Sequence, residues 1–351
     1  MKFTKMHGCG NDYIYIWLDE KMATDATTPD CVRALFESAP MTGELPLYKE
    51  KLSVAHLSAA QAATFNSPNG SLSDTDISAL EDLIVHISDR HKGIGSDGVI
   101  FMREAWEEGA DFEMLMYNAD GSKGKMCGNG IRCVAIYIYE HGLTKKETFV
   151  VTSAGLPHEL QLQTMQELSA VQDKVISVRV DMGAPILIPS QIPVKLPDEI
   201  EPEKSSVCDA LISIPFFVDG FEYRFTPVSM GNPHAVVFLP DDVDLMALDL
   251  PAIGRVFEHA PLFPERVNTE FVHVDDRNNV HMRVWERGSG ETQCCGTGCC
   301  AITVAAVLNG LTDRIVHVHC LGGTVTCEYT EGPDGTVFMT GPGETVFEAE
   351  I

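Results

Sequence analysis

A single sequence template occurs twice in this chain, and it constrains the fold more than any other feature. The two copies begin at Cys127 and Cys295, and each runs Cys-Gly-x-Gly, an apolar stretch and a closing Gly-Leu pair. Each cysteine also follows a polar residue by nine positions, Asn118 in the first copy and Glu286 in the second. A duplicated helix opened by a thiol predicts two related domains that supply matched acid/base groups to one active site.

The template predicts where each helix begins and ends. The glycine-rich turns after Cys127 and Cys295 have backbone N–H groups suited to hold an anion at a helix N-terminus. Gly142 and Gly310 stand where a left-handed residue commonly closes a helix. A thiol at such a start is expected to have a pKa lowered from about 8.5 to roughly 3.5–7.5. Core packing explains one such cysteine, but two at matching positions indicate chemistry.

Composition excludes several classes of protein. The chain has 351 residues, 44% of them hydrophobic, which suffices for two domains with well-buried cores. Its net charge of −26 argues against nucleic-acid or anionic-membrane partners, which require clusters of Lys and Arg. The eleven cysteines are an odd number, some of them adjacent, and neither a signal peptide nor a membrane-spanning run is recognisable. A cytoplasmic, reducing location is therefore expected.

The order of predicted elements indicates an α+β fold. Thr28-Pro29-Asp30 opens a helix that runs to about Glu37, and an Asp-Gly pair joins the strands Phe216–Val218 and Phe221–Phe225 in a hairpin. Many strands around one buried helix, made twice, predict two pseudo-symmetric domains. The first is expected over residues 1–148, with a surface insertion over about 22–73, and the second over 149–340.

Three other patterns carry weaker signals. The glycines of Gly93–Gly98 fit a dinucleotide-binding spacing, but they follow a helix and have no acidic partner in a βαβ context. His317 and His319 share one face of a strand, so a metal site there is an alternative. The cysteines within 294–300 lack Cys-x-x-Cys spacing on a buried helix, and apart from Cys295 they are interpreted as small apolar residues.

Amide and charged side chains next to strands are more specific candidates. Asn11, Asn118, Asn232 and Asn268 all lie in predicted turns, where each alone is a turn or capping residue. The segment Glu286–Thr292 differs, because its acid and base end a strand and lead into the second cysteine turn. These two charges could match the cationic and anionic ends of a substrate.

Five motifs then follow in order along most of the chain: Met-His-Gly-x-Gly-Asn-Asp, Asn-Ala-Asp-Gly-Ser, Met-Cys-Gly-Asn-Gly-x-Arg-Cys, Gly-Asn-Pro-His and Glu-Arg-Gly-x-Gly-Glu-Thr-x-x-Cys-Gly-Thr-Gly. In these the chain resembles the diaminopimelate epimerase family. The resemblance implies a cofactor-free isomerase that converts LL-2,6-diaminopimelate to meso-diaminopimelate in lysine and peptidoglycan-precursor synthesis. It further implies that each domain is a curled mixed sheet around a central buried helix, and that residues 341–351 return to the first domain.

The resemblance also implies roles for individual residues. Cys127 and Cys295 would be the two catalytic bases, and His234 would assist near a catalytic thiol. Backbone N–H groups of Gly128, Asn129, Gly296 and Thr297 would hold the reacting carboxylate. The remaining substrate groups would be bound by six side chains: Asn11, Asn118, Asn232, Asn268, Glu286 and Arg287. No metal is implied, the expected partner is the small-molecule substrate, and a homodimer is left open.

Two alternatives stay open at this point. Proline racemases and hydroxyproline epimerases use the same two-cysteine chemistry, but they typically have His where Asn129 stands and Thr-Ser after the second Cys-Gly-Thr-Gly. In this chain that position is Cys299-Cys300. A thiol redox or metal-binding protein would explain the many cysteines but not the ordered asparagines.

Overall fold

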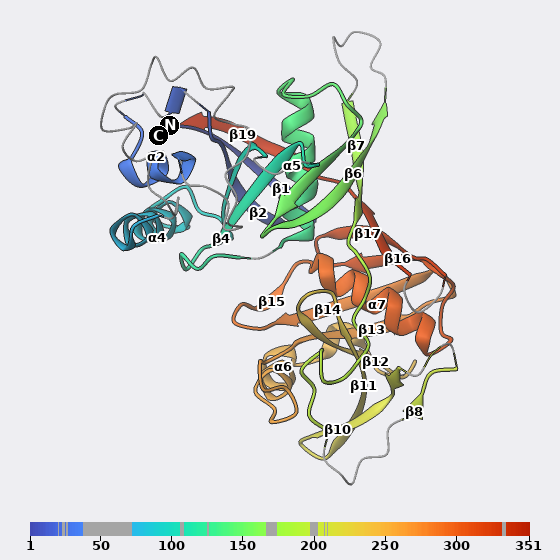
Figure 1. Ribbon diagram of the computed structural model, residues 1–351. Helices are drawn as coiled ribbons and strands as arrows, with labels where there is room; N and C mark the ends of the chain where they lie inside the picture. The colour runs from blue at the N-terminus through green and yellow to red at the C-terminus, as the bar shows by residue number, and fades with distance from the viewer. Residues whose placement is uncertain are drawn as a thin grey trace. The chain divides into compact units, whose positions relative to one another are not determined.

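The fold is described from a computed structural model (Figure 1). The structure describes residues 1–37 except 20, 23, 24 and 26, residues 72–165 except 106–108 and 125, residues 174–331 except 197–202, 207 and 209, and residues 335–351. The chain forms two compact units. Unit 1 consists of Met1–His7, Asp12–Val175 and Glu344–Ile351, and unit 2 consists of Gly8–Asn11 and Ile176–Gly343.

Unit 1 is a mixed sheet with helices on both of its faces. The strands β2 and β3, and likewise β4 and β5, run parallel, whereas β1–β19, β3–β4 and β5–β6 are antiparallel pairs. The bounds are β1 Lys2–Gly8, β2 Asn11–Trp17, α2 Asp30–Glu37, α4 Asp74–Ser88, β3 Gly98–Glu104, β4 Phe112–Asn118, α5 Gly128–Glu140, β5 Thr148–Ser153, β6 Leu156–Met165 and β19 Glu344–Glu350.

Unit 2 repeats this plan with more strands. The pairs β12–β13 and β14–β16 are parallel, whereas β10–β11, β11–β12, β13–β14, β16–β17, β17–β18 and β18–β7 are antiparallel. The bounds are β7 Lys174–Asp181, β8 Glu203–Lys204, β9 Leu211–Ile212, β10 Ile214–Val218, β11 Phe221–Ser229, β12 Pro233–Phe238, the 3₁₀ turn η3 Leu245–Ala247, α6 Leu250–Glu258, β13 Asn268–Val274, β14 Asn279–Glu286, β15 Gly290–Thr292, α7 Gly296–Leu308, β16 Ile315–Cys320, β17 Gly323–Tyr329 and β18 Val337–Gly341.

The two units correspond strand by strand. Strands β2 to β6 of unit 1 pair in the same order and the same directions as β12, β13, β14, β16 and β17 of unit 2. The predicted pseudo-symmetric α+β fold with mixed sheets is confirmed. In unit 2 the sheet curls around its helix, since α7 contacts β11, β12 and β13 as well as β16, β17 and β18.

The central helices α5 and α7 follow the template at both ends. Each starts directly after its cysteine, which is the N-cap residue. Each closes with a left-handed glycine, at Gly142 (φ 70°) and Gly310 (φ 71°). The next N–H, from Leu143 or Leu311, donates to the carbonyl five residues earlier, as in a Schellman motif. Every residue of α7 and most of α5 are buried, which explains why their sequences are apolar on all sides.

Other helices cover the outer faces of the two sheets. In unit 1, α2 and α4 pack on β1, β2 and β3 through Val32, Leu35 and Ile84. In unit 2, Phe257 of α6 packs against the rings of Phe225 and Phe271. Strands such as β3 and β4 are therefore buried on both faces, whereas β16 and β17 have partly exposed residues and β19 is exposed along its length.

Several local predictions can now be compared with the structure. The helix from Thr28 is observed as α2, and the Asp-Gly hairpin as β10 and β11, with Asp219 (φ 50°) and Gly220 (φ 85°) in the turn. Unit 1 extends beyond the expected boundary near residue 148, because β5 pairs with β4 and β6 with β5. Its returning segment begins at Glu344 rather than 341. Of the expected insertion at about 22–73, residues 38–71 lie outside the described residues.

Candidate active site

In unit 1 the predicted base Cys127 caps helix α5. Its Sγ accepts a hydrogen bond from the N–H of Gly130 at 3.2 Å, and the side chain is half-buried. A side chain at Gly130 would be tight, because a Cβ would lie 2.7 Å from Ile100 Cδ1, at the end of a flexible side chain, and 3.2 Å from Cys127 Cβ. The thiol is thus held directly against the first turn of a buried helix, where the helix dipole favours negative charge.

A buried arginine braces the turn after Cys127. The Arg132 guanidinium donates to the carbonyl of Gly128 at 3.2 Å and to Oδ1 of Asn129 at 2.9 Å, and Arg132 is fully buried. The Tyr15 hydroxyl reaches the carbonyl of Gly130 at 3.4 Å. The Asn129 side chain therefore helps to fix the turn.

The two asparagines predicted for this half lie at strand ends. Asn118 is the last residue of β4, and its amide donates to Ser122 Oγ at 3.0 Å. Asn11 is the first residue of β2, is half-buried, and groups with unit 2 by its contacts. Both positions suit a ligand-facing amide, since strand ends leave side chains outside the packed sheet.

In unit 2 the predicted base Cys295 caps helix α7 in a different way. Its backbone angles (φ −112°, ψ 111°) resemble those of Cys127, but its side chain makes no capping hydrogen bond to the helix. Its Sγ lies instead 3.5 Å from the Thr297 hydroxyl, and the residue is buried. Side chains around this thiol, rather than helix N–H groups alone, therefore control its proton.

A continuous polar chain leads from that hydroxyl to a buried carboxylate. The Asn232 amide N–H donates to Thr297 Oγ1 at 3.2 Å. The Oδ1 atom of the same amide lies 3.1 Å from His234 Nε2. His234 Nδ1 lies 2.6 Å from Glu270 Oε1, and both side chains are fully buried. The two ring nitrogens of His234 thus join the Asn232 amide oxygen to the Glu270 carboxyl group. The structure thus brings Asn232, His234, Thr297 and Cys295 together.

The second group of predicted residues lies at the ends of β13 and β14. Asn268 Oδ1 accepts the backbone N–H of Arg287 at 2.9 Å, and Arg287 Nη1 donates to the carbonyl of Glu265 at 3.1 Å. The guanidinium is otherwise exposed. Glu286 accepts from the Thr292 hydroxyl and hydrogen-bonds with the Cys295 thiol. An acid beside the thiol and an exposed cation next to it in sequence fit an amino-acid substrate.

Charge around Cys295 overturns one expectation. Burial raises the pKa of the Cys295 thiol well above its usual range, and the carboxylates of Glu286 and Glu270 raise it further. The nearby Thr297 hydroxyl and Gly298 N–H act in the opposite direction but do not outweigh them. The predicted lowering of the pKa at the helix start is therefore wrong for this cysteine. Loss of hydration likewise raises the pKa of Glu286.

Glu270 is a functional candidate that the motifs did not reveal. Its Oε2 has no hydrogen-bond partner among the described residues, and a Cβ at Gly298 would lie 2.7 Å from its Oε1. The signal was present in the sequence, because residues two apart in a strand face the same side. A ligand-facing Asn268 therefore places Glu270 on the same face, next to the helix start.

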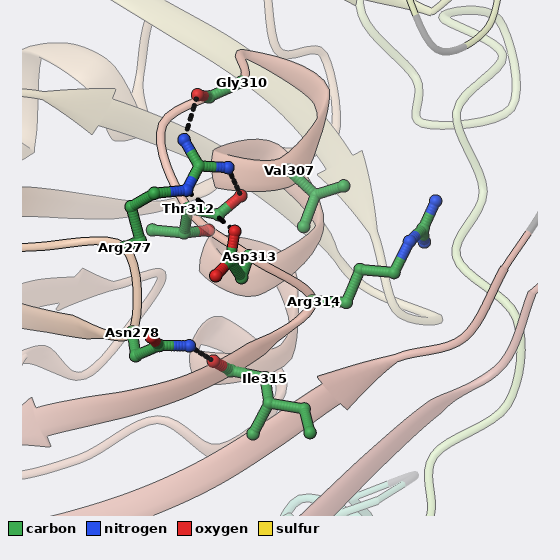
Figure 2. Close-up of a pocket in the computed structure, with 8 residues that line it drawn as sticks. All are labelled: Arg277, Asn278, Val307, Gly310, Thr312, Asp313, Arg314 and Ile315. Carbon is green, nitrogen blue, oxygen red and sulfur yellow. Dashed lines mark hydrogen bonds and ion pairs between the residues drawn. The ribbon is translucent and has the colours of Figure 1, made fainter.

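A pocket of about 600 Å³ lies elsewhere in unit 2, at the C-terminal end of α7 (Figure 2). The Arg277 guanidinium, which lines this pocket, donates to the carbonyls of Gly310 and Thr312 and to the Asp313 carboxylate. The Arg314 side chain points away from these groups. Arg277 caps the carbonyls that follow α7 and so stabilises the end of that helix. None of the predicted site residues lines this pocket.

Solved structures share the fold. A probable proline racemase from Agrobacterium radiobacter K84 superposes with a TM-score of 0.60 at 12% identity, covering 100% of this chain and 92% of its own. A hydroxyproline epimerase from Agrobacterium vitis gives a TM-score of 0.58 at 14% identity, covering 100% and 90%. The chain thus has the two-unit fold found in amino-acid racemases and epimerases.

Sequence comparison defines the family. Residues 69–188 and 226–346 match the model of the family described as diaminopimelate epimerase. A protein of Agathobacter rectalis named diaminopimelate epimerase is 42% identical, with 100% of this chain and 99% of that protein covered. One of the same name from Acetivibrio thermocellus is 40% identical, with 100% and 98% covered. This chain belongs to the diaminopimelate epimerase family. Among the described residues, no helix has the length and apolar character to cross a membrane.

Proposed function

We propose that this chain epimerises LL-2,6-diaminopimelate to meso-diaminopimelate, as an isomerase of lysine and peptidoglycan-precursor synthesis. The observation that carries the proposal is the matched pair of thiols, since Cys127 and Cys295 each cap a buried helix with the same glycine-rich start. Full-length relatives named diaminopimelate epimerase support the choice of substrate.

The proposed reaction inverts one α-carbon by two proton transfers. One thiolate removes the α-proton from one face of the carbon, and the other thiol gives its own proton to the opposite face. The two sulfurs thereby exchange protonation states, so the reverse reaction uses the same groups in exchanged roles. Since the pKa of Cys295 is raised, we propose that Cys295 starts as the protonated partner and that Cys127 acts first as the base.

Negative charge that develops on the substrate carboxylate needs stabilisation, since the proposal includes no cofactor to accept it. The helix N-termini at Gly128, Asn129, Gly296 and Thr297 supply backbone N–H groups and the positive end of the helix dipole. Glu286, Arg287 and the four asparagines are proposed to bind the remaining carboxylate and ammonium groups. Arg287 is suited to a carboxylate because its exposed guanidinium can bind both oxygens.

Incubation of the purified chain in D2O with LL-diaminopimelate tests the proposal, with L-proline as a parallel substrate. The expected result is meso-diaminopimelate carrying one deuterium at the inverted carbon, and unchanged L-proline. The double variant Cys127→Ala/Cys295→Ala is the matched control and should leave both amino acids unlabelled. Racemisation of L-proline without reaction of diaminopimelate would establish the proline-racemase alternative.

Two accompanying expectations belong to the same proposal. A cytoplasmic location is expected for an enzyme whose many thiols include catalytic ones, and fractionation of the native cells checks it. The homodimer stays a prediction, which light scattering of the purified chain at several concentrations tests.

A further inference from the structure

Cysteines distant in sequence converge in unit 2. Cys294 precedes the cap of α7, Cys299 lies in the helix, and Cys320 ends β16. The Sγ atoms of these three all lie within 4.8 Å of one another, and those of Cys299 and Cys320 are 3.5 Å apart. The Cys294 thiol also hydrogen-bonds with Cys9, from the turn between β1 and β2. These four residues are called the thiol cluster.

The local fold explains the convergence. Cys294 directly precedes the N-cap residue Cys295, and Cys299 is the fourth residue of α7. Side chains at these two positions commonly pack together, as in a hydrophobic staple. Cys9 adopts a left-handed backbone (φ 53°), which is uncommon for this residue type. Two glycines make room for it, since a Cβ at Gly322 would lie 1.8 Å from the Cys9 carbonyl oxygen, and one at Gly323 would lie 3.3 Å from its Sγ. The turn is thus shaped to bring the Cys9 thiol to the cluster.

A route leads from solvent to the thiol cluster. Cys320 lines a pocket of about 430 Å³ in unit 2, and the cysteine itself is partly exposed. The other lining side chains that carry charge or imidazole are Asp241, Asp242, Asp244, His273, His281 and His319. Carboxylates and imidazoles attract divalent cations, so the pocket provides an entrance of the right chemistry.

We propose that the thiol cluster is a structural binding site for Zn²⁺. A tetrahedral zinc ion bound to sulfur at about 2.3 Å places its ligands about 3.8 Å apart, close to the spacing of the three core thiols. Binding is not a redox step, because each thiol loses one proton to solvent as its sulfur–zinc bond forms. The ion would tie the start of α7 to β16 and to the turn at Cys9, and so fix the backbone next to Cys295. This inference is independent of the proposed function.

The competing interpretation is that the four cysteines are small core residues without a ligand. The two interpretations differ in a direct measurement on the full chain. The chain is reduced, treated with chelator, desalted, and titrated with Co²⁺ as a spectroscopic probe and then with Zn²⁺. The proposal expects a thiolate-to-metal charge-transfer band that saturates at one Co²⁺ per chain and disappears when Zn²⁺ replaces it.

Variants locate the bound ion. Cys294→Ala and Cys320→Ser should each weaken metal binding at least tenfold, whereas Cys300→Ala, a buried helix cysteine outside the cluster, should leave it unchanged. The double variant Cys127→Ala/Cys295→Ala should still bind one ion, which separates the cluster from the catalytic thiols. Binding retained by Cys294→Ala and Cys320→Ser, or lost in the double variant, would overturn the proposal.

A measurement on the unaltered chain guards against variants that fail to fold. Alkylation followed by peptide mapping should show that Zn²⁺ protects Cys320, the partly exposed member of the cluster, but not Cys208, which is also partly exposed. Thermal unfolding should shift to higher temperature with rising Zn²⁺ concentration. Absence of both effects, or a Cys299–Cys320 disulfide in place of metal binding, would show that the thiol cluster is not a zinc site.

Discussion

The two units place the same thiol on the same backbone turn and then surround it differently. In unit 1 the Cys127 sulfur accepts a helix N–H, and the neighbouring strand residue is the apolar Ile100. In unit 2 the Cys295 sulfur contacts a hydroxyl, and the strand residue in the matching place is Glu270. Backbone symmetry therefore does not impose chemical symmetry, and the difference lies in strand side chains.

This difference has a functional meaning. A pair of thiols that transfers two protons needs one member charged and one protonated at the start. The carboxylates near Cys295 favour its protonated form, whereas the helix N–H at Cys127 favours a thiolate. In the proposed reaction the duplication would supply the same backbone geometry twice, and the different strand residues would give each thiol its starting role.

The largest effect is expected from removing either thiol. Cys127→Ala and Cys295→Ala should each lower turnover of diaminopimelate by about 10³-fold or more, since no other group can replace the proton transfer on that face. Each variant should still exchange the α-proton of one stereoisomer in D2O, and opposite stereoisomers in the two variants. Mass spectrometry of the recovered amino acids measures both. Near-normal turnover by either variant would end the two-base interpretation.

Glu270→Gln tests the polar chain that only unit 2 has. The change removes the carboxylate that holds His234, and we expect kcat to fall by about 10²-fold, while KM changes less than threefold. Because Glu270 acts through His234, the pH profile of kcat should also change shape. Glu113→Gln is the control, as this buried carboxylate pairs with Arg103 and should affect only stability. An unchanged pH profile of kcat would show that Glu270 has only a structural role.

Arg287→Met examines a charge present only in the second copy. Loss of the bidentate partner of a substrate carboxylate should raise KM at least tenfold, about 1.4 kcal/mol, with a smaller effect on stability. Arg266→Met serves as control, because that exposed arginine pairs with Glu258 and should leave KM unchanged. If KM of the Arg287 variant stayed within a factor of about two, this assignment would be wrong.

Alanine at the two matching glycines compares the units directly. In Gly298→Ala the new methyl meets the Glu270 carboxylate, and the shift of that group away from His234 should cost about tenfold in kcat. In Gly130→Ala the methyl meets the end of Ile100, which can rotate. Both new methyls lie similarly close to the Cβ of their own cysteine, at 3.2 Å and 3.1 Å, so the loss of activity in Gly130→Ala should be the smaller one, less than about threefold. Steady-state kinetics of both variants decides the point. Equal losses would mean that the strand residues do not distinguish the units.

The smallest effect concerns the pH dependence of alkylation. The thiolate is the reactive form, and the pKa of Cys295 is raised, so its alkylation should require higher pH than that of a free cysteine. In Glu286→Gln one of the charges that raise this pKa is gone, so the profile should move to lower pH. Iodoacetamide labelling with peptide mapping follows Cys295 itself. Rapid labelling of Cys295 below neutral pH would contradict the described electrostatics.

The sequence predicted those features that local rules determine. The caps at Cys127 and Cys295, the closing glycines and the Asp-Gly hairpin follow from backbone preferences within a few residues, and all are observed. The raised pKa of Cys295 was missed because it depends on Glu286 and Glu270, whose distance from the thiol is set by packing. The thiol cluster was missed for the same reason, since Cys9 and Cys320 reach it only through tertiary folding.

Strand β19 brings the last segment of unit 1 to its first segment, although most of unit 2 lies between the two in the sequence. It pairs antiparallel with β1 from Lys2↔Glu350 to His7↔Glu344. A ribosome makes β1 among the first of these residues and β19 among the last, so the edge of β1 stays unpaired while the 335 residues from 9 to 343 are synthesised. Unit 2 has all of its strands before then. The unit that starts first on the ribosome is therefore the one that closes last, and until then β1 is open to pairing with other nascent chains.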